Sequence, residues 1–233
     1  DRDHARAAAF LQRAAPSLDP ARRNSALASA YLALILAREP ARAAALRQQL
    51  GERSASPELT QLDAAVEVFS GDAETALAIA VEGMQRFPDD APLRLLAGQL
   101  MLLLDRPNEL KALADDTIAR LPDQPEGWEL RGRWLADVQG DYRGAIAAFD
   151  EALARDPASM AGLNEQALAF YAIDEDREAE RLLRQALDKD PRNGAARANL
   201  AILLLDQNRE AEATPLVERL RADDPGLSTG LLL

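Results

Sequence analysis

The sequence predicts an all-α fold, a solenoid in which helix hairpins are stacked one after another. Three observations favour this fold class. Alanine and leucine dominate the chain, and aromatic residues make up only 4% of it, a composition typical of helices rather than of sheets. Prolines recur every 34 or 35 residues. Between successive prolines lie two stretches with a helical apolar pattern, separated by a short polar turn, which is the layout of a helical repeat.

The prolines mark where the repeating units end, because proline cannot continue a helix and restrains the residue before it. Those at intervals of 34, 35, 34 and 34 residues are Pro88, Pro122, Pro157, Pro191 and Pro225, and Pro20 lies twice 34 residues before the first of them. Small residues recur 12 and 24 positions before these marks, where only alanine or glycine lets two helix backbones cross closely. They are Ala8, Ala76, Ala145, Ala179 and Ala213 in one column, and Ala30, Ala64, Gly98, Ala167 and Ala201 in the other, with Gly132 one position out of step.

This spacing predicts six hairpin units and part of a seventh, which together form a single solenoid over residues 1–233. In each unit a helical run is followed by a polar turn such as SGDAE or DEDRE, and a second helical run ends near the proline. The predicted units span residues 1–22 (the second helix of a broken unit), 23–56, 57–90, 91–124, 125–159, 160–193 and 194–227, followed by a tail, 228–233.

Three units depart from the pattern, and in unit 91–124 the departure is Leu110 in place of the alanine, so its helix pair is expected to be slightly splayed or its neighbours smaller. Unit 23–56 has Arg42 where most other units have alanine, and we expect a slip of one or two residues rather than an arginine at a helix crossing. Unit 125–159 has one extra residue between Gly132 and Gly140. A bulge in its first helix, a longer turn or a shifted register would each accommodate that residue, and the sequence leaves all three open.

Unit 125–159 is also the one that fits a known pattern most fully. Its pattern residues are Trp128, Gly132, Gly140, Asp141, Tyr142, Ala145, Phe149, Ala152 and Pro157. In this order they resemble the tetratricopeptide repeat (TPR) family, and the resemblance extends over nearly the whole chain. It implies a right-handed superhelix whose concave face, lined by the first helix of each unit, receives an extended peptide or a partner helix.

Counting the inner positions of the first helices predicts a mixed groove, mostly apolar with spaced amides, which suits a peptide backbone and its side chains. The residues predicted to bind a partner are Gln61, Val68, Gln99, Arg133, Trp134, Asn164, Leu168, Tyr171, Asn199 and Ile202. Trp134 has two interpretations. Six positions after Trp128 it is rotated by about 240° on an α-helix, so it either anchors a partner in the groove or packs against the adjacent unit because of the extra residue.

The sequence predicts no catalytic, cofactor or metal site. There is no cysteine, His4 is the only histidine, and no glycine-rich phosphate loop is present. Pairs such as Asp89–Asp90 are expected to cap helices. The net charge of −12 argues against nucleic acid as a partner, so RNA-binding pentatricopeptide units fit poorly. No inner lysine is present to complete the clamp with which some TPR co-chaperones hold acidic tails.

We therefore expect a non-enzymatic scaffold or adaptor that binds protein or peptide partners, in the assembly of a bacterial complex. The alternative is a regulatory or substrate-docking domain of a larger enzyme. No apolar run approaches the length of a membrane span, and a cysteine-free chain suits cytoplasm or periplasm. The start at Asp1 indicates a processed or excised chain. For the terminal GLSTGLLL we expect either that the natural chain continues, or that the tail docks into the groove of its own or of a neighbouring molecule, the latter giving a homodimer.

Overall fold

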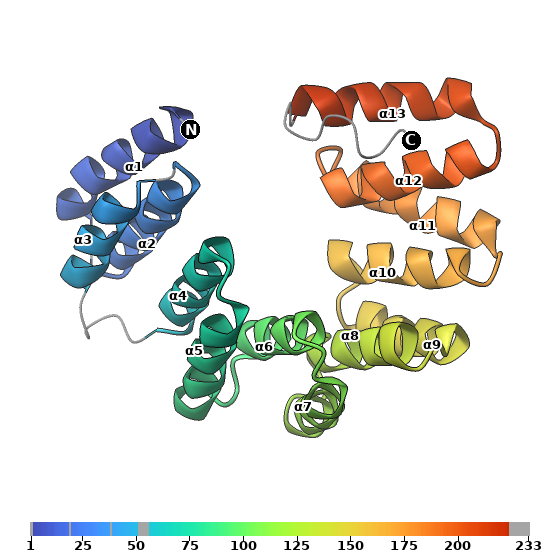
Figure 1. The fold of residues 1–233 in the computed structure, drawn as a ribbon, viewed down its shortest axis with the longest axis horizontal. Coiled ribbons are helices and arrows are strands. Elements are labelled where there is room, and N and C mark those ends of the chain that lie inside the picture. The colour runs from blue at the N-terminus through green and yellow to red at the C-terminus, as the bar shows by residue number, and fades with distance from the viewer. Residues whose placement is uncertain (1, 19, 38, 51–55, 224–233) are drawn as a thin grey trace. The chain divides into compact units, whose positions relative to one another are not determined.

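The structure is a computed structural model that describes residues 2–18, 20–37, 39–50 and 56–223. Over this range every regular element is a helix (Figure 1). The elements are α1 (Arg2–Ala14), the 3₁₀ turn η1 (Ala15–Ser17), α2 (Pro20–Leu36), α3 (Pro40–Leu50), α4 (Pro57–Ser70), α5 (Ala73–Arg86), α6 (Ala91–Leu103), α7 (Pro107–Arg120), α8 (Glu126–Arg133), the π-helical turn η3 (Trp134–Val138), α9 (Tyr142–Arg155), α10 (Met160–Tyr171), α11 (Asp176–Lys189), α12 (Gly194–Asp206) and α13 (Glu210–Asp223). The predicted all-α fold is confirmed.

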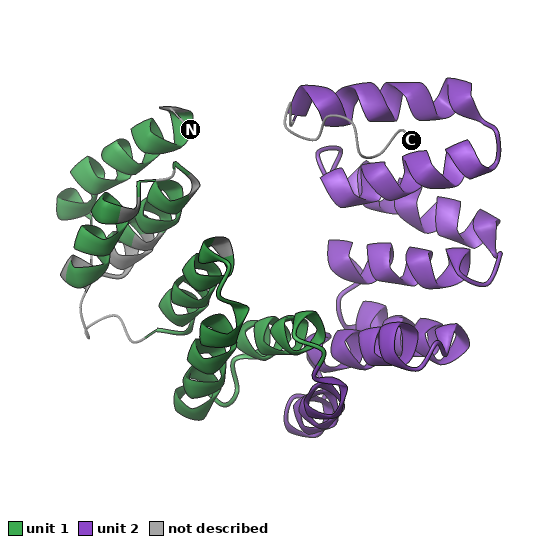
Figure 2. Ribbon diagram, viewed as in Figure 1, with its two compact units in different colours: residues 1–105 green, residues 106–233 purple. Residues whose placement is uncertain are grey.

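The chain divides into two compact units (Figure 2). Unit 1 comprises residues 1–105 with α1 to α6, and unit 2 comprises residues 106–233 with α7 to α13. The boundary lies inside the predicted repeat 91–124, whose two helices belong to different units. Each unit is therefore described by itself, and the division of the chain into individual repeats stays a prediction.

The two columns of small residues lie at the centre of the helix packing. Every alanine in them is at most 1% exposed, and Gly98 and Gly132 are buried as well. Arg42 is exposed and pairs with Glu39, while its neighbour Ala43 is 1% exposed. The expected slip is therefore confirmed, and it amounts to one residue: alanine rather than arginine occupies the buried position of α3.

Most of the helices from α4 onward are preceded by a residue whose side chain accepts a hydrogen bond from the first turn of the helix. Helix N–H groups in the first turn have no partner within the helix, so a preceding Ser, Asp or Asn accepts from one of them. The capping residues are Ser56, Asp72, Asp90, Asp141, Ser159 and Asn193, at distances of 2.8 to 3.4 Å. The expectation that Asp90 serves as a cap is confirmed.

The turns inside the five hairpins from α4 to α13 share one position in the left-handed region of backbone conformation. The described residues with positive φ are Gly71, Asp105, Gly140, Asp174 and Asn208, and they follow one another at intervals of 34, 35, 34 and 34 residues. This left-handed conformation favours glycine, and Asn and Asp tolerate it better than other residues. The polar turns seen in the sequence thus contain a repeated backbone requirement that Gly, Asp or Asn meets.

The core of the C-terminal part of unit 2 is built from α10, α11, α12 and α13. Its buried residues include Leu163, Ala167, Leu183, Leu200 and Leu203. Leu168 and Ile202, on α10 and α12, are instead each 38% exposed. Two first helices, α10 and α12, thus bury one face in the core while part of another face remains open to solvent.

Candidate functional site

Helices α10 and α12 meet along three pairs of residues, which we call the three rungs. In the first rung, the Asn199 amide donates to Asn164 Oδ1 at 2.8 Å. The middle rung is formed by Leu168 and Ile202, which line the same hollow from the two helices. In the last rung, the Tyr171 hydroxyl donates to the carboxylate of Asp206. The partners of the middle rung are 34 residues apart and occupy the same position of two successive predicted repeats, whereas those of the other two rungs are 35 residues apart and differ by one position.

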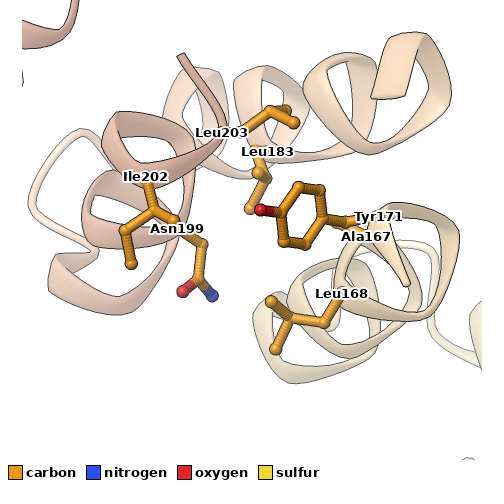
Figure 3. A pocket seen from close by; sticks show the side chains of 7 residues that line it. All are labelled: Ala167, Leu168, Tyr171, Leu183, Asn199, Ile202 and Leu203. Atoms are coloured by element: carbon orange, nitrogen blue, oxygen red, sulfur yellow. The ribbon is translucent and has the colours of Figure 1, made fainter. Parts of the chain in front are cut away.

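A hollow of about 150 Å³ lies at the middle rung (Figure 3). Its lining residues, none of which carries a charge, are Ala167, Leu168, Tyr171, Leu183, Asn199, Ile202 and Leu203. Because Leu168 and Ile202 are 38% exposed, the hollow is open to solvent. A cavity of this volume lined by aliphatic side chains holds a group the size of benzene. The structure thus brings four predicted binding residues, Leu168, Tyr171, Asn199 and Ile202, around one apolar hollow.

The last rung carries negative charge. The hydrogen bond to Asp206, burial and the charges of Asp206, Asp176 and Asp174 raise the pKa of Tyr171. Asp174 and Asp206 are exposed. Arg209, just after α12, is held by Glu180 and Glu212 at 2.7 and 2.8 Å. The end of the three rungs is therefore polar and rich in carboxylates.

Arg133 joins α8 to α10. Its guanidinium lies 2.7 Å from Glu165 Oε1, one position after Asn164. Burial, with the charges of Asp137 and Glu129, raises the pKa of Glu165 although Arg133 opposes the shift. Burial also raises the pKa of Asp137. One guanidinium thus faces three carboxylates, and negative charge is in excess here too.

The extra residue of the predicted repeat 125–159 lies in η3. In this turn the Gln139 N–H donates to the Trp134 carbonyl at 3.3 Å, five residues back, which is the π-helical pattern. Of the three possibilities that the sequence left open, the structure shows the bulge. The repeat accommodates its additional residue inside the first helix.

Trp134 lies against α7. Its ring centroid is 5.6 Å from Lys111 Nζ, and it lines a small hollow with Lys111, Ala114, Asp115 and Arg131. This position agrees with packing against the adjacent helix pair rather than with the three rungs. A role of Trp134 in partner binding stays a prediction that this geometry does not favour.

The predicted residues of unit 1 lie on α4 and α6. Gln61 on α4 donates to the capping carboxylate of Asp90 at 3.2 Å. Val68, also on α4, is 39% exposed, and Gln99 on α6 is half-buried. Their part in binding a partner stays a prediction.

Counting inner helical positions did not identify two residues of this region. Asp206 completes the last rung, and Glu165 forms the ion pair with Arg133. Asp206 had a signal in the sequence, because it lies 35 residues after Tyr171, the same spacing as Asn164 to Asn199. Glu165 had none: it is next to an inner position and is recognised by its contact with Arg133. Leu183 and Leu203 form the base of the hollow as core residues.

Other kinds of site are not found in the part of the chain that the structure describes. No group of three or more potential metal ligands occurs there, and His4 is exposed on α1. None of the helices within these ranges has the length and apolar character needed to cross a membrane. The terminal GLSTGLLL, on which the predicted homodimer depends, lies outside the described residues.

Comparison with known proteins agrees with this architecture. Residues 177–228 match the family model described as tetratricopeptide repeat. No curated protein sequence matches the chain. Among solved structures, a thermophilic TPR protein of Thermus thermophilus is similar with a TM-score of 0.66 and 18% identity, covering 74% of this chain and 93% of that one.

Two further structures are similar at low identity. The type IV pilus biogenesis factor PilW has a TM-score of 0.61 and 17% identity, covering 74% of this chain and 79% of its own. A chain of the APC/C hetero-tetramer Cut9–Hcn1 has a TM-score of 0.70 and 14% identity; the match covers 97% of this chain and 45% of that one. At these identities the similarity shows the fold.

Proposed function

We propose that this tetratricopeptide repeat protein is a non-catalytic scaffold that binds a segment of a partner protein on the open face of α10 and α12. The observation that carries the proposal is the apolar hollow between Leu168 and Ile202, flanked by the hydrogen-bonded amides of Asn164 and Asn199. A partially exposed apolar site with adjacent amide groups suits a peptide. The apolar side chains of the peptide can enter the hollow, while the asparagine amides hydrogen-bond to the peptide backbone.

The arrangement offers binding rather than chemistry. The hollow is lined by aliphatic side chains, one phenol and one amide, and the phenol already donates to a carboxylate. A nucleophile next to a base, the usual arrangement for covalent catalysis, is not among the residues that line it. Because equivalent or neighbouring positions of two successive predicted repeats build the site, it has the form of a surface for an elongated partner. Similar structures include a pilus biogenesis factor and a chain of a hetero-tetramer, and we extend to this chain a role in assembling a bacterial complex.

Selection from a phage-displayed library of random 12-residue peptides tests the proposal. We expect the protein to enrich a set of peptides, and the double variant Leu168→Ser with Ile202→Ser to lose them while its helical circular dichroism is unchanged. The control is Phe10→Ser, which removes an exposed apolar side chain (64% exposed) from unit 1. If the double variant binds the same peptides as the unchanged protein, the partner-binding face lies elsewhere.

A further inference from the structure

The apolar hollow between α10 and α12 lies between two regions of excess negative charge. On one side, Glu165 is one helical turn before Leu168 on α10, and Glu129 and Asp137 act on it together with a single guanidinium, Arg133. On the other side, Asp206 is one turn after Ile202 on α12 and accepts from Tyr171. Glu165 and Asp206 thus stand on either side of the middle rung, and the groups around them come from three successive predicted repeats.

The second of these regions has no cation among the charged groups that act on Tyr171. Those groups are Asp206, Asp176 and Asp174, and the charge of each raises the pKa of Tyr171. Asp176 accepts from Gln207 at 3.2 Å, whereas Asp174 and Asp206 are exposed to solvent. The neighbouring Arg209 is already paired with Glu180 and Glu212. The exposed carboxylates of Asp174 and Asp206, close to the Tyr171 phenol, can therefore pair with a cation of another molecule.

From this charge distribution we infer that the occupant of the hollow is a basic protein segment, with one apolar side chain next to lysine or arginine. The apolar side chain enters the hollow between Leu168 and Ile202, and a cation lies beside Asp206 and Asp174. The inference rests on the proposed function and adds the chemistry of the partner. Attraction between opposite charges favours such a segment, and like-charge repulsion excludes acidic ones.

The same argument predicts how binding depends on conditions. Exposed charge pairs contribute little each and are screened by salt. Removing one exposed carboxylate should therefore weaken binding by roughly two- to fivefold, and raising the salt concentration should have a similar effect. The apolar contact contributes affinity that salt does not weaken, so the two contributions separate experimentally.

The test uses the charge of the peptides that the full chain enriches from the random 12-residue library. We expect lysine and arginine to be enriched on one or both sides of a leucine, isoleucine or phenylalanine. Fluorescence anisotropy with the most enriched peptide then compares Asp206→Asn and Asp174→Asn with Asp188→Asn, a matched change of an exposed carboxylate on α11. The first two variants should bind roughly two- to fivefold more weakly, and Asp188→Asn should bind as the unchanged protein does.

The outcomes separate this inference from the proposed function. One such outcome is that the protein enriches apolar peptides without basic residues, which Leu168→Ser with Ile202→Ser no longer binds and which Asp206→Asn binds unchanged. That result would overturn the inference of a basic occupant, and the proposed binding at the hollow would stand. If no enriched peptide depends on Leu168 and Ile202 for binding, both the proposed function and the inference of a basic occupant are overturned. A dimer in light scattering that Ile202→Ser dissociates would identify a second copy as the occupant and overturn the inference of a separate basic partner.

Discussion

Gly132 and Phe149 meet where α8 crosses α9. A Cβ atom on Gly132 would lie 2.5 Å from Phe149 Cε1, and Phe149 is itself 1% exposed, so its ring has little space to move. We expect Gly132→Ala to lower the free energy of unfolding by about 1–3 kcal/mol, the cost of overpacking a filled core. Urea denaturation followed by circular dichroism measures it.

Gly194 provides the matched control for this change. It is the first residue of α12, and the nearest atom to a new Cβ, on Leu220, is 4.0 Å away. Gly194→Ala should therefore leave stability unchanged or raise it by up to about 1 kcal/mol, because alanine reduces the freedom of the unfolded chain. Equal effects of the two substitutions would show that the α8–α9 crossing is not as close as the structure has it.

The repeat prolines show a regularity that the sequence conceals. Each of the carbonyls of Pro88, Pro122, Pro157 and Pro191 accepts a hydrogen bond from a cationic side chain. Arg94 and Arg197 bond to the prolines six residues before them. Arg155 and Lys189 bond to prolines 33 and 32 residues before them. Because the same need is met from two places in the repeat, no single column of the sequence predicts it.

Trp134 illustrates a second limit of sequence reasoning. Because α8 is a regular helix up to Arg133, counting gives the direction of Trp134 relative to Trp128, but it does not tell which neighbouring element lies there. The π-helical turn η3 begins at this residue, and the structure places its ring against α7. By contrast, Leu168, Tyr171, Asn199 and Ile202 lie on uninterrupted helices, and counting brought them to one hollow.

Helices α11 and α13 are joined by ion pairs that depend on pH. Glu180 accepts from Arg184 on its own helix and from Arg209, and Arg184 and Arg209 also pair with Glu212 on α13. The hydrogen bonds from Arg209, in the first place, and from Arg184 lower the pKa of Glu180 to about 2. The ordinary pKa of this glutamate, which applies to the unfolded chain, is 4.5.

Because the pKa of Glu180 is lower in the folded state, its ion pairs stabilise the fold fully above the unfolded pKa and lose this effect as pH falls from about 4.5 to about 2. Glu180→Gln should thus cost about 1 kcal/mol at pH 7, since solvent screens such pairs, and almost nothing near pH 2. Urea denaturation at several pH values measures the difference. Glu178→Gln, which removes a pair within α11, is the control. A pH-independent cost of Glu180→Gln would contradict the assignment.

The sequence predicts the helix pairs readily, because repeat spacing, small crossing residues and closing prolines all mark the same boundaries. The bulge that follows α8 was not determined by them: an insertion of one residue satisfies the spacing equally well in a helix or in a turn. Only the hydrogen bond from Gln139 to Trp134 distinguishes the two. Local pattern thus predicts which segments are helical, while hydrogen bonding determines how an irregular residue is absorbed.

Within each compact unit, the principal contacts join elements that are adjacent, or next but one, along the chain. Stability in such a protein is approximately a sum over repeats and their nearest neighbours. A local change should therefore have a local effect. This distinguishes the chain from a globular domain of the same length, in which one core joins distant segments.

Hydrogen exchange of Gly132→Ala tests this expectation over the whole chain. The substitution should speed amide exchange most in α8 and α9, less in their contact neighbours α7 and α10, and not at all in α1 to α3. The physical reason is that opening of one helix pair exposes only the surfaces that it shares with adjacent helices. Gly194→Ala serves as the control, with exchange in no helix faster than in the unchanged protein. A uniform increase in all helices would show that the chain unfolds as one cooperative body, and the additive description would then be wrong.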